Sequence, residues 1–484
     1  MVIPLSLVLV GDILTGRGVA PVLRAPQSSL WRYQCLIAGA DLAWGNLEEA
    51  PLSSLTGRKP FYNAGDLDVL RSVGFDGLNL ANNHSLDAGS AGARQTLQAL
   101  ANLGLKGAGL SVGESPSVPI WNVGGRRVAL VAATQWGPFS NGNAQLTRLN
   151  SQTMCATIRE LSAQGIFVVV SVHWGTEGVS SISAQQREMA HEFIDAGAVA
   201  VWGHHPHIVG PIENYKGKPI FASTGNFLWD TMPTPQSGLL ARLQIEGTPP
   251  QSAKVSWKTW KLDPQVRILK EPPTPSGESR VGAFVGRFDS DNSRLSWMLW
   301  TRNGRGTPVL RAMEAVQDGW RVRATGLPRE VRGIQIGDLT GDGRDEVVVE
   351  LFQRSKLDAQ NKVRLHVYDV EADRFKPLWR GSMLSRPFFE WRLVGRGDDI
   401  ARDVAALERG QNGLQWLTVY RWNGFGLRVV WQKPFKTKLS GLQSGCDRYG
   451  TFLRLLSVTG NIHKALRIRR SSGENWRVEG VDSP

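Results

Sequence analysis

Short apolar runs that alternate with helix-like stretches restrict most how the first half of this chain can fold. Six runs of apolar or β-branched residues, bounded by Gly, Asn or Asp, are typical of buried strands. These runs are residues 5–10, 77–80, 128–132, 166–172, 198–202 and 220–222. The clearest helical pattern, residues 183–196, opens with the capping-box pair Ser183 and Gln186 and stops at Gly197. This alternation predicts a layered α/β architecture.

The pattern of apolar and turn residues changes after residues 270–280, which read KEPPTPSGESR and are typical of a linker. Beyond it, short Trp-rich strands and turns recur, and related phrases begin near Phe284, Ile334, Trp391 and Leu442. A repeat of about 50 residues made of short strands is typical of propeller blades. The predicted domains are residues 1–269, a linker at residues 270–283 and an all-β propeller-like domain over residues 284–484.

Charge is concentrated in the second half of the chain. Residues 1–270 hold 21 Lys and Arg against 18 Asp and Glu, whereas the remaining residues hold 35 against 25. A basic second half favours anionic partners, and it is equally explained by a solvated arginine-rich surface. No run of consecutive Lys and Arg marks a nucleic-acid-binding arm, so the sequence gives no strong nucleic-acid signal.

Cysteine spacing and hydropathy bear on the compartment. Cys35, Cys155 and Cys446 are far apart, which predicts neither a disulfide framework nor a CxxC zinc site. No segment reaches the roughly 18 apolar residues of a membrane-spanning helix, and the apolar start lacks the basic region and cleavage site of a signal peptide. The default expectation is a cytoplasmic protein, and the alternative is an export or anchor segment upstream of Met1.

Polar side chains follow the predicted strands at the point where each strand ends. They are Asp12, Asn83, His84, His173, His204, His205 and His207. Ligand sites in α/β sheets form at the carboxyl ends of strands, so we expect these side chains to converge. His191 and His366 instead fall inside a helical and a strand pattern and are expected to be structural.

These residue types suit a hydrolytic centre with two metal ions. Carboxylates bind divalent cations, imidazoles bind Zn, Mn or Fe, and an Asn carbonyl can complete a site without adding charge. Two cations about 3.5–4 Å apart activate a shared water and stabilise charge on a phosphoryl group. A nearby histidine can protonate the leaving oxygen. The sequence therefore predicts one or two ions of Mn, Fe or Zn.

Six motifs resemble those of the CapA family of poly-γ-glutamate capsule synthesis proteins, in the family's order. They are GDILTGR (11–17), GNLEEAP (45–51), LANNHSLDAG (80–89), VHWGTEG (172–178), GHHPHIVGPIENYKGKPI (203–220) and STGNFLWD (223–230). That family is similar to the calcineurin-like metallophosphoesterases. The resemblance implies a four-layer α/β/β/α metallophosphoesterase-like sandwich, followed here by the propeller-like repeat domain.

The resemblance also implies roles for individual residues. The implied metal ligands are Asp12, Glu48, Asn83, His173, His205 and His207, with His204 beside the final pair. The implied catalytic residues are His84, which would contact the phosphoryl group, Arg17, which would bind an anionic oxygen through two hydrogen bonds, and Glu177. Candidate supporting groups are Asp87, Glu213, Asn226 and Asp230.

Structural explanations for these residues remain open beside the functional ones. Asp12 can form a turn after its strand, and Asn83 can occupy a left-handed loop. Glu177 can form a salt bridge, and Arg17 can be an ordinary surface residue. Leu14 stands where phosphoesterases usually carry the histidine of an Asp-x-His motif, which leaves the number of bound metal ions open.

A loop in the second half resembles the FG-GAP/VCBS calcium loop. Its candidate oxygen ligands and neighbours are Asp338, Thr340, Asp342, Arg344 and Glu346. Oxygen atoms at alternating positions, with Gly allowing the turn, can surround Ca²⁺. Related phrases have Arg287 and Arg396 where Asp338 stands, so one calcium site is predicted at most. The alternative is a hairpin turn without an ion.

The leading functional hypothesis is a CapA-like metal-dependent hydrolase of the phosphoesterase type, involved in the synthesis or export of poly-γ-glutamate or a related envelope polymer. Its partners would be an anionic polymer or phosphoester substrate and the envelope-polymer machinery. The alternative is a non-catalytic protein that keeps the fold and binds an anionic polymer. A nucleotidase or nuclease is a third option, suggested by fold analogy and basic charge.

Overall fold

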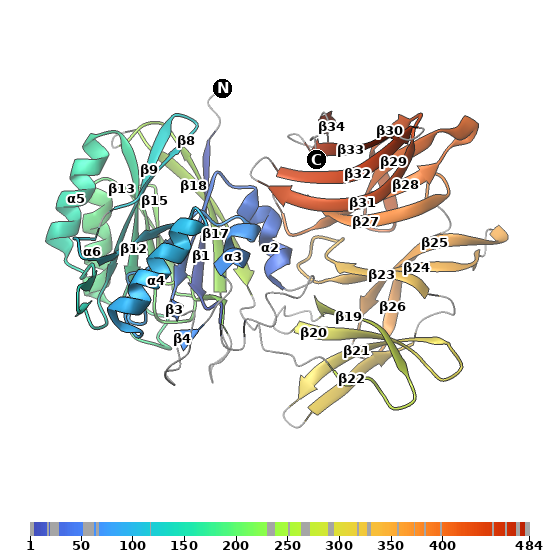
Figure 1. Cartoon of the computed structure of the whole chain (residues 1–484), viewed down its shortest axis with the longest axis horizontal. Coiled ribbons are helices and arrows are strands. Elements are labelled where there is room, and N and C mark those ends of the chain that lie inside the picture. The colour runs from blue at the N-terminus through green and yellow to red at the C-terminus, as the bar shows by residue number, and fades with distance from the viewer. Residues whose placement is uncertain are drawn as a thin grey trace. The chain divides into compact units, whose positions relative to one another are not determined.

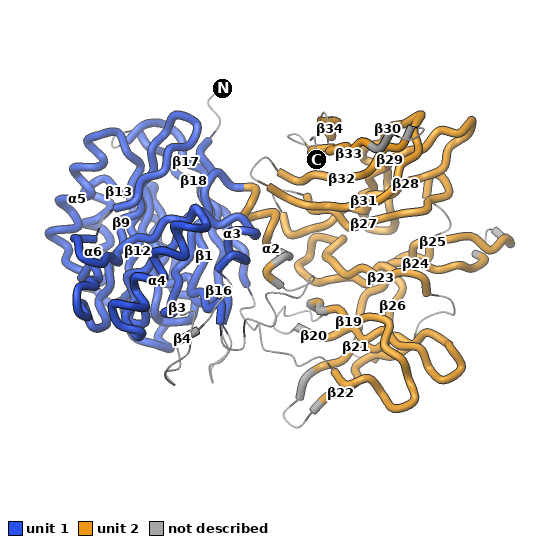
Figure 2. The backbone as a smooth tube through the Cα atoms, viewed as in Figure 1, with its two compact units in different colours: residues 1–26, 40–268 blue, residues 27–39, 269–484 orange. Residues whose placement is uncertain are grey.

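A computed structural model gives the fold of the chain in two compact units, shown in different colours in Figure 2. The first unit comprises residues 1–26 and 40–268, and the second comprises residues 27–39 and 269–484. Each unit is described by itself. The structure describes residues 4–16, 19, 29–51, 62–63, 67–116, 118–229, 238–249, 252–262, 272–288, 295–316, 319–326, 331–355, 358–371, 373–381, 384–396, 399–447, 450–459, 462–470 and 475–479.

Two large mixed sheets form the first unit (Figure 1). The first has the order β18-β17-β1-β2-β5-β6, with β16 also paired to β1. Its strands are β1 (Leu5–Ile13), β2 (Leu42–Leu47), β5 (Gly77–Asn79), β6 (Lys106–Ala108), β16 (Asn226–Leu228), β17 (Gly238–Glu246) and β18 (Lys254–Leu262). The second has the order β14-β15-β13-β12-β9-β8. Its strands are β8 (Ile120–Val123), β9 (Arg126–Thr134), β12 (Ile166–His173), β13 (Ala198–His204), β14 (Ile212–Tyr215) and β15 (Lys218–Phe221).

Small sheets and four helices complete the described part of this unit. Strands β7 (Leu110–Val112), β10 (Ser140–Asn141) and β11 (Ala144–Leu146) form one small sheet, and β3 (Ala50–Pro51) pairs with β4 (Tyr62–Asn63). The helices are α3 (Leu67–Val73), α4 (Gly89–Asn102), α5 (Ser151–Ala163) and α6 (Ala184–Asp195). The six strand predictions and the helix prediction for this region are confirmed, including the capping box at Ser183 and the left-handed Gly197 after α6.

The core of the first unit lies between its two large sheets. Leu7 and Trp44 of the first sheet share one buried cluster with Leu130 and Phe167 of the second. Because successive side chains of a strand point to opposite faces, the alternate residues of β9 and β12 form a separate cluster with α5 and α6. Sheets packed face to face, with helices on the outer side of the second, give the layered α/β fold that the sequence predicts.

The second unit contains four antiparallel sheets of four strands, each formed by consecutive strands (Figure 1). The first two sheets are β19 (Ser279–Arg287), β20 (Leu295–Arg302), β21 (Pro308–Val316) and β22 (Gly319–Thr325), then β23 (Val331–Gly337), β24 (Glu346–Ser355), β25 (Asp358–Val370) and β26 (Phe375–Arg380). The last two are β27 (Phe388–Gly395), β28 (Arg402–Arg409), β29 (Gln415–Trp422) and β30 (Leu427–Phe435), then β31 (Lys438–Asp447), β32 (Gly450–Thr459), β33 (Ile462–Arg470) and β34 (Trp476–Glu479). A short 3-10 helix, η1 (Gln411–Gly413), lies between β28 and β29.

The predicted sequence repeat corresponds to this arrangement, since each repeated phrase begins on or beside the first strand of one sheet. No ordering of the described strands joins the four sheets into one closed sheet. The propeller-like architecture therefore stays a prediction. No helix among the residues that the structure describes has the length and apolar character needed to cross a membrane.

One segment from early in the chain belongs to the second unit. Helix α2 (Ser29–Ala38) lies between β1 and β2 in the sequence, but it contacts β31 and β32. Cys35 of this helix forms a disulfide with Cys446 of β31, with 5.0 Å between the Cα atoms. The prediction of no disulfide is therefore wrong for this pair, because 411 positions of sequence separation conceal a close contact in the fold. Cys155 is a buried free thiol.

Candidate metal centre

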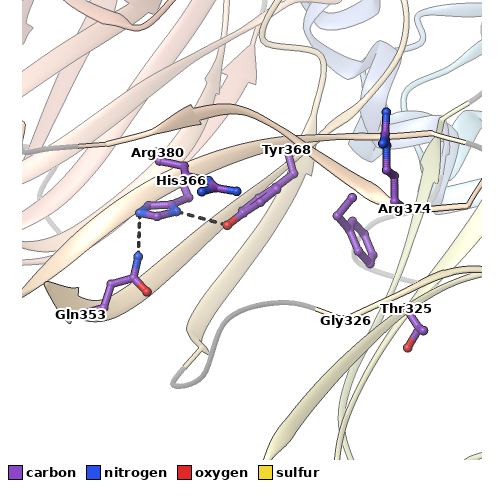
Figure 3. A pocket seen from close by; sticks show the side chains of 8 residues that line it. Thr325, Gly326, Gln353, His366, Tyr368, Arg374 and Arg380 are labelled. Carbon is purple, nitrogen blue, oxygen red and sulfur yellow. Dashed lines mark hydrogen bonds between the residues drawn. The ribbon is translucent and has the colours of Figure 1, made fainter. Parts of the chain in front are cut away.

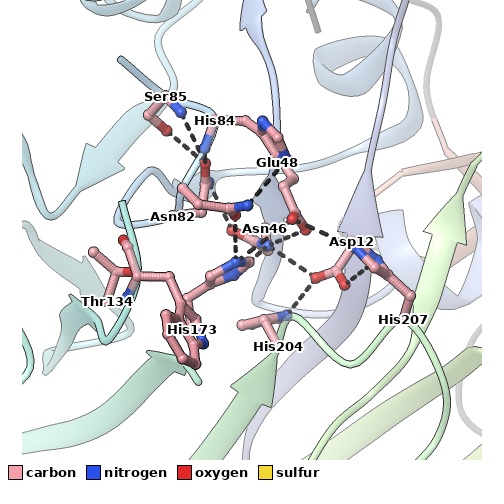
Figure 4. Close-up of polar contacts among 12 residues, drawn as sticks. Asp12, Asn46, Glu48, Asn82, His84, Ser85, Thr134, His173, His204 and His207 are labelled. Atoms are coloured by element: carbon pink, nitrogen blue, oxygen red, sulfur yellow. Dashed lines mark hydrogen bonds and ion pairs between the residues drawn. The ribbon is translucent and has the colours of Figure 1, made fainter. Parts of the chain in front are cut away.

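Asp12 is placed by the end of β1, where that strand runs parallel to β16 and β2. Its backbone N–H donates to the carbonyl of Gly225 at 2.9 Å. A Cβ atom on Gly11 would lie 1.9 Å from that carbonyl oxygen, so this close approach requires glycine at position 11. The carboxylate of Asp12 is fully buried, with Oδ1 2.9 Å from His204 Nδ1 and Oδ2 3.1 Å from His207 Nδ1 (Figure 4).

Glu48 follows β2 and is also fully buried. Its Oε1 lies 3.5 Å from His173 Nε2 and 3.6 Å from His207 Nε2. The side chain of His173, at the end of β12, points back to Asn83, whose Oδ1 lies 2.8 Å from the same Nε2 atom. One carboxylate therefore faces two imidazoles, one from the end of β12 and one from the loop after β13.

Asn46 holds the two carboxylates in place, and sequence reasoning missed it. Its amide nitrogen donates to Asp12 Oδ1 at 2.8 Å and to Glu48 Oε2 at 3.3 Å. Its carbonyl oxygen accepts from the amides of Asn79 and Asn82, each at 3.1 Å (Figure 4). These donors fix which end of the Asn46 amide faces the carboxylates. The signal available was its position two residues before Glu48, on the same side of an extended chain.

The loop after β13 brings three histidines to the same place. His204 ends the strand, and His205 and His207 adopt left-handed backbone conformations, with φ of 93° and 58°. Non-glycine residues rarely adopt positive φ, and such strain is concentrated at functional sites. His207 also lies 2.9 Å from Asn226 Oδ1 through its Nδ1 atom, which confirms Asn226 as a neighbour of the cluster.

Two overlapping groups of these side chains have the spacing required to hold metal ions. Glu48, His173 and His205 form one group, and Asp12, Glu48 and His207 form the other; the ligand atoms of each lie within 4.8 Å of one another. Buried Glu48 Oε1, His204 Nε2 and His205 Nδ1 form no hydrogen bond with any residue that the structure describes. Buried polar atoms without partners are costly, and a cation would satisfy them. The donor set therefore fits a metal ion.

Burial and mutual charge determine the protonation of this cluster. Burial raises the pKa of Glu48 well above its usual value, and the charge of Asp12 adds to this. Burial opposes ionisation of Asp12 too, but hydrogen bonds from His204 and His207 outweigh it and hold the pKa of Asp12 well below its usual value. Two buried acidic side chains so close together favour a positive partner between them.

The imidazoles divide into two kinds. Burial, together with the charge of His205, lowers the pKa of His173 well below its usual value. Burial and the charge of His207 lower the pKa of His205 to about 4. Burial disfavours the charge of His207 as well, but Glu48 and Asp12 raise its pKa to about 10. His173 and His205 are therefore neutral at pH 7, which is the form that binds metals.

Further groups surround the cluster. His84 Nδ1 lies 2.9 Å from Asp87 Oδ2, and His84 is partly exposed, with 17% of its side chain accessible. Trp136 is 40% exposed, and its ring centre lies 5.7 Å from that of His205. Glu177 is exposed, and its charge raises the pKa of Glu48 and opposes the lowering at His205. The cluster thus has neighbours that are accessible to solvent, among them His84 and the ring of Trp136.

Three further predicted site residues remain. Glu213 pairs with Arg187 at 3.0 Å and with His191 at 2.5 Å, and its predicted supporting role stays a prediction. Its strand β14 lies at the edge of the second sheet, where those partners are available. Arg17 and Asp230 lie outside the described residues, and their predicted roles stay predictions.

The predicted calcium loop has its acidic oxygens engaged within the chain. Asp338 and Glu346 are almost fully buried and accept hydrogen bonds from backbone amides of their own loop. Arg344 pairs with Asp342 at 2.9 Å and with Asp369 at 3.2 Å. Burial raises the pKa of Glu346 to about 8. Among described residues, the clusters spaced to hold a metal ion lie in the first unit, and calcium stays a prediction.

Known proteins resemble the first unit. Residues 6–231 match the family model described as bacterial capsule synthesis protein PGA_cap. PGA biosynthesis protein CapA of Bacillus subtilis (strain 168) is 32% identical over 249 residues, covering 47% of this chain and 63% of the relative. Capsule biosynthesis protein CapA of Bacillus anthracis is 31% identical over 250 residues, covering 47% and 60%.

The match spans less than two thirds of the length of these relatives. Among solved structures, a 5'-nucleotidase from Candida albicans SC5314 aligns at 11% identity over 52% of this chain and 50% of that chain, with a TM-score of 0.33, which is too low to support an argument. Residues 6–231 of this chain are therefore similar to the bacterial capsule synthesis (PGA_cap, CapA) family.

Proposed function

We propose that the first unit is a metal-dependent hydrolase of the phosphoesterase type that acts in the synthesis or export of poly-γ-glutamate or a related envelope polymer. The single observation that carries the proposal is the pair of buried ligand groups that share Glu48. A carboxylate shared between two positions is typical of two-metal hydrolytic centres. The relatives named for PGA and capsule biosynthesis support the biological role.

The proposed fold in finer detail is the four-layer α/β/β/α sandwich of the metallophosphoesterases, followed by a propeller-like domain. Two sheets with a common core, and helices α5 and α6 outside the second sheet, support the first part. Four consecutive four-stranded sheets support the second part. The partners would be an anionic polymer or a phosphoester and the machinery that makes or exports the polymer.

Different sets of residues would hold the two cations. Asp12, Glu48 and His207 would hold one cation, and Glu48, His173 and His205, with Asn83 beside them, would hold the other. When bound, Mn, Fe or Zn supplies Lewis acidity toward a phosphoryl or amide oxygen. Because Asn46 and its amide donors fix the carboxylates, the ligands are preorganised before any ion binds.

His84 is the proposed proton donor to the leaving oxygen. Its Nδ1 contact with Asp87 orients the ring, and the amide nitrogen of Asn83 donates to Nε2 at 3.0 Å, so Nε2 would take up a proton before giving it to the leaving oxygen. The partly exposed ring can contact both solvent and a substrate, as such a transfer requires. Asp87 acts through His84 and is a positioning residue.

Metal analysis of the purified chain tests the centre. After supplementation with Mn, Fe or Zn and desalting, mass spectrometry should find bound metal in the wild type and less metal in His173→Ala, which loses a buried ligand. His191→Ala is the matched control, because that histidine lies in the same unit but pairs with Glu213. Wild-type protein without bound metal, or equal metal in His173→Ala, would contradict the proposal.

A second candidate function is the non-catalytic binding of an anionic polymer. It is favoured by Leu14, which is fully buried where an Asp-x-His motif would carry a histidine ligand. Assays with a generic phosphodiester and with poly-γ-glutamate separate the two functions. Turnover that is lost in His84→Asn while metal content is kept supports the hydrolase. Polymer binding without turnover by the metal-loaded wild type supports the binding protein.

A further inference from the structure

The second unit contains a polar pocket at one end of the core shared by its first two sheets (Figure 3). Its volume is about 400 Å³. Two lining residues are Thr325, the last residue of β22, and Gly326 after it. The others come from β24, β25 and β26 or the turn between β25 and β26, and they are Gln353, His366, Tyr368, Arg374, Phe375 and Arg380. Two arginines and no acidic residue line it, so a ligand inside meets positive charge.

The strand register explains why three of these side chains converge. His366 and Tyr368 are two positions apart on β25 and therefore point to the same face. Arg380 of β26 pairs directly with His366 across the two strands, which places both side chains on that face. Tyr368 belongs to the buried cluster that joins the first two sheets, so the pocket begins where this core ends.

A chain of hydrogen bonds fixes the direction in which the Tyr368 hydroxyl can donate. The amide nitrogen of Gln353 lies 3.2 Å from His366 Nε2, and His366 Nδ1 lies 3.2 Å from the hydroxyl of Tyr368 (Figure 3). An amide N–H can only donate, so Nε2 accepts and Nδ1 carries the proton of a neutral ring. Nδ1–H then donates to the hydroxyl oxygen, and the hydroxyl proton is left to donate into the pocket.

The charges around His366 keep this arrangement in place at neutral pH. His366 is 3% exposed. Burial, followed by the charges of Arg380 and Arg364, lowers the pKa of His366 to about 4. Arg374 pairs with Glu371 at 2.8 Å, which offsets its charge. Arg380 is the lining arginine whose charge lowers the pKa of His366. The site therefore offers a guanidinium and an aimed hydroxyl donor.

We propose that this pocket binds a carboxylate group, held by the guanidinium of Arg380 and the hydroxyl of Tyr368. A guanidinium donates two parallel hydrogen bonds to a carboxylate, and a hydroxyl donor satisfies a remaining lone pair. Neither interaction involves the metal centre of the first unit. Only the choice of probe rests on the proposed function, because the relatives are named for PGA biosynthesis.

Calorimetric titration of the full chain with a short γ-linked glutamate oligomer tests the proposal. Arg380→Ala should weaken binding about tenfold or more, because hydrogen bonds to a charged group are lost. Arg380→Lys should give a smaller loss, and Tyr368→Phe should weaken binding about threefold to tenfold. Arg454→Ala in the last sheet is the matched control, since it removes the same charge from an exposed position and should leave binding unchanged.

Two further titrations identify the ligand chemistry and its source. A γ-linked isoglutamine oligomer, in which amides replace the free α-carboxylates, should bind at least about tenfold more weakly. Free glutamate that binds as tightly as the oligomer would indicate a site for small carboxylates, and preference for the oligomer would indicate a polymer site; both support the carboxylate proposal.

Equal binding by Arg380→Ala and the wild type, or the same loss in Arg454→Ala, would overturn the proposal. Arg380 is exposed, so its replacement should not prevent folding, and unchanged thermal unfolding would verify this. Arg380→Ala should leave the metal content of the first unit unchanged. Failure of the carboxylate site and failure of the metal centre are therefore distinguishable.

Discussion

At the scale of single residues, His366 makes the stability of the second unit depend on pH. Its pKa is about 4 in the folded chain, mainly because of burial, and about 6.5 in an unfolded chain. As pH falls from 6.5 toward 4, the unfolded state takes up the proton first, so the stabilisation present above pH 6.5 is lost. The loss should reach about 3 kcal/mol.

Thermal unfolding measured at pH 7 and pH 4.5, with hydrogen exchange of β25 as the local readout, checks this expectation. His366→Gln removes the titrating group and should flatten the pH dependence. His191→Gln, in the first unit, should leave it as in the wild type. A wild-type β25 whose protection is the same at both pH values would contradict the assignment.

The sequence could predict the ligands of the candidate metal centre better than their supports. Asp12, His173 and His205 follow long apolar runs, and that pattern places each of them at the carboxyl end of a strand, where ligand sites form. Asn46 lies inside the run LAWGNL, and its position two residues before Glu48 is its one local signal, because its other partners come from neighbouring strands. His366 lies inside a strand pattern and was expected to be structural. Its pocket has no local signal either, since it depends on the register between neighbouring strands.

At the scale of elements, the capping box of α6 should contribute measurably to the order of that helix. The Ser183 hydroxyl accepts from the Gln186 backbone N–H at 3.1 Å, and the Gln186 side chain accepts from the Ser183 N–H at 2.9 Å. Ser183→Ala should cost about 1 kcal/mol, because it leaves an amide of the first turn without a partner.

Hydrogen exchange of residues 184–187 by mass spectrometry should become faster in Ser183→Ala. Ser181→Ala is the matched control, since that serine is exposed just before the helix and lies outside the capping box. Equal acceleration in both variants would show that the cap does not stabilise the first turn.

The elements that the sequence predicts are those with local signals. The buried strands and α6 have apolar runs and caps, and both appear at the expected positions. The membership of α2 in the second unit has no such signal, because it depends on contacts with strands about 400 residues away. Local patterns determine an element's type, whereas its partners follow from tertiary packing.

At the scale of the whole molecule, the chain connects its two units in more than one way. Residues 27–39 belong to the second unit but are flanked on both sides by residues of the first. The disulfide between Cys35 and Cys446 ties this early segment to the last sheet of the chain. A break between residues 268 and 272 would therefore not release the second unit from the rest of the chain.

A site-specific protease sequence inserted after Lys270 tests this consequence. After cleavage, the fragments carry Cys35 and Cys446 respectively, so a non-reducing gel should show one species and a reducing gel should show two. Cys35→Ser should give two species under both conditions, and Cys155→Ser, which removes the free thiol, should behave as the wild type. Disulfides form in oxidising compartments. The protein should therefore be produced in the periplasm or at the cell surface, so that the cysteines are oxidised before cleavage. Two species from oxidised wild-type protein on the non-reducing gel would show that the cysteines are not joined and that α2 is held to the second unit by packing alone.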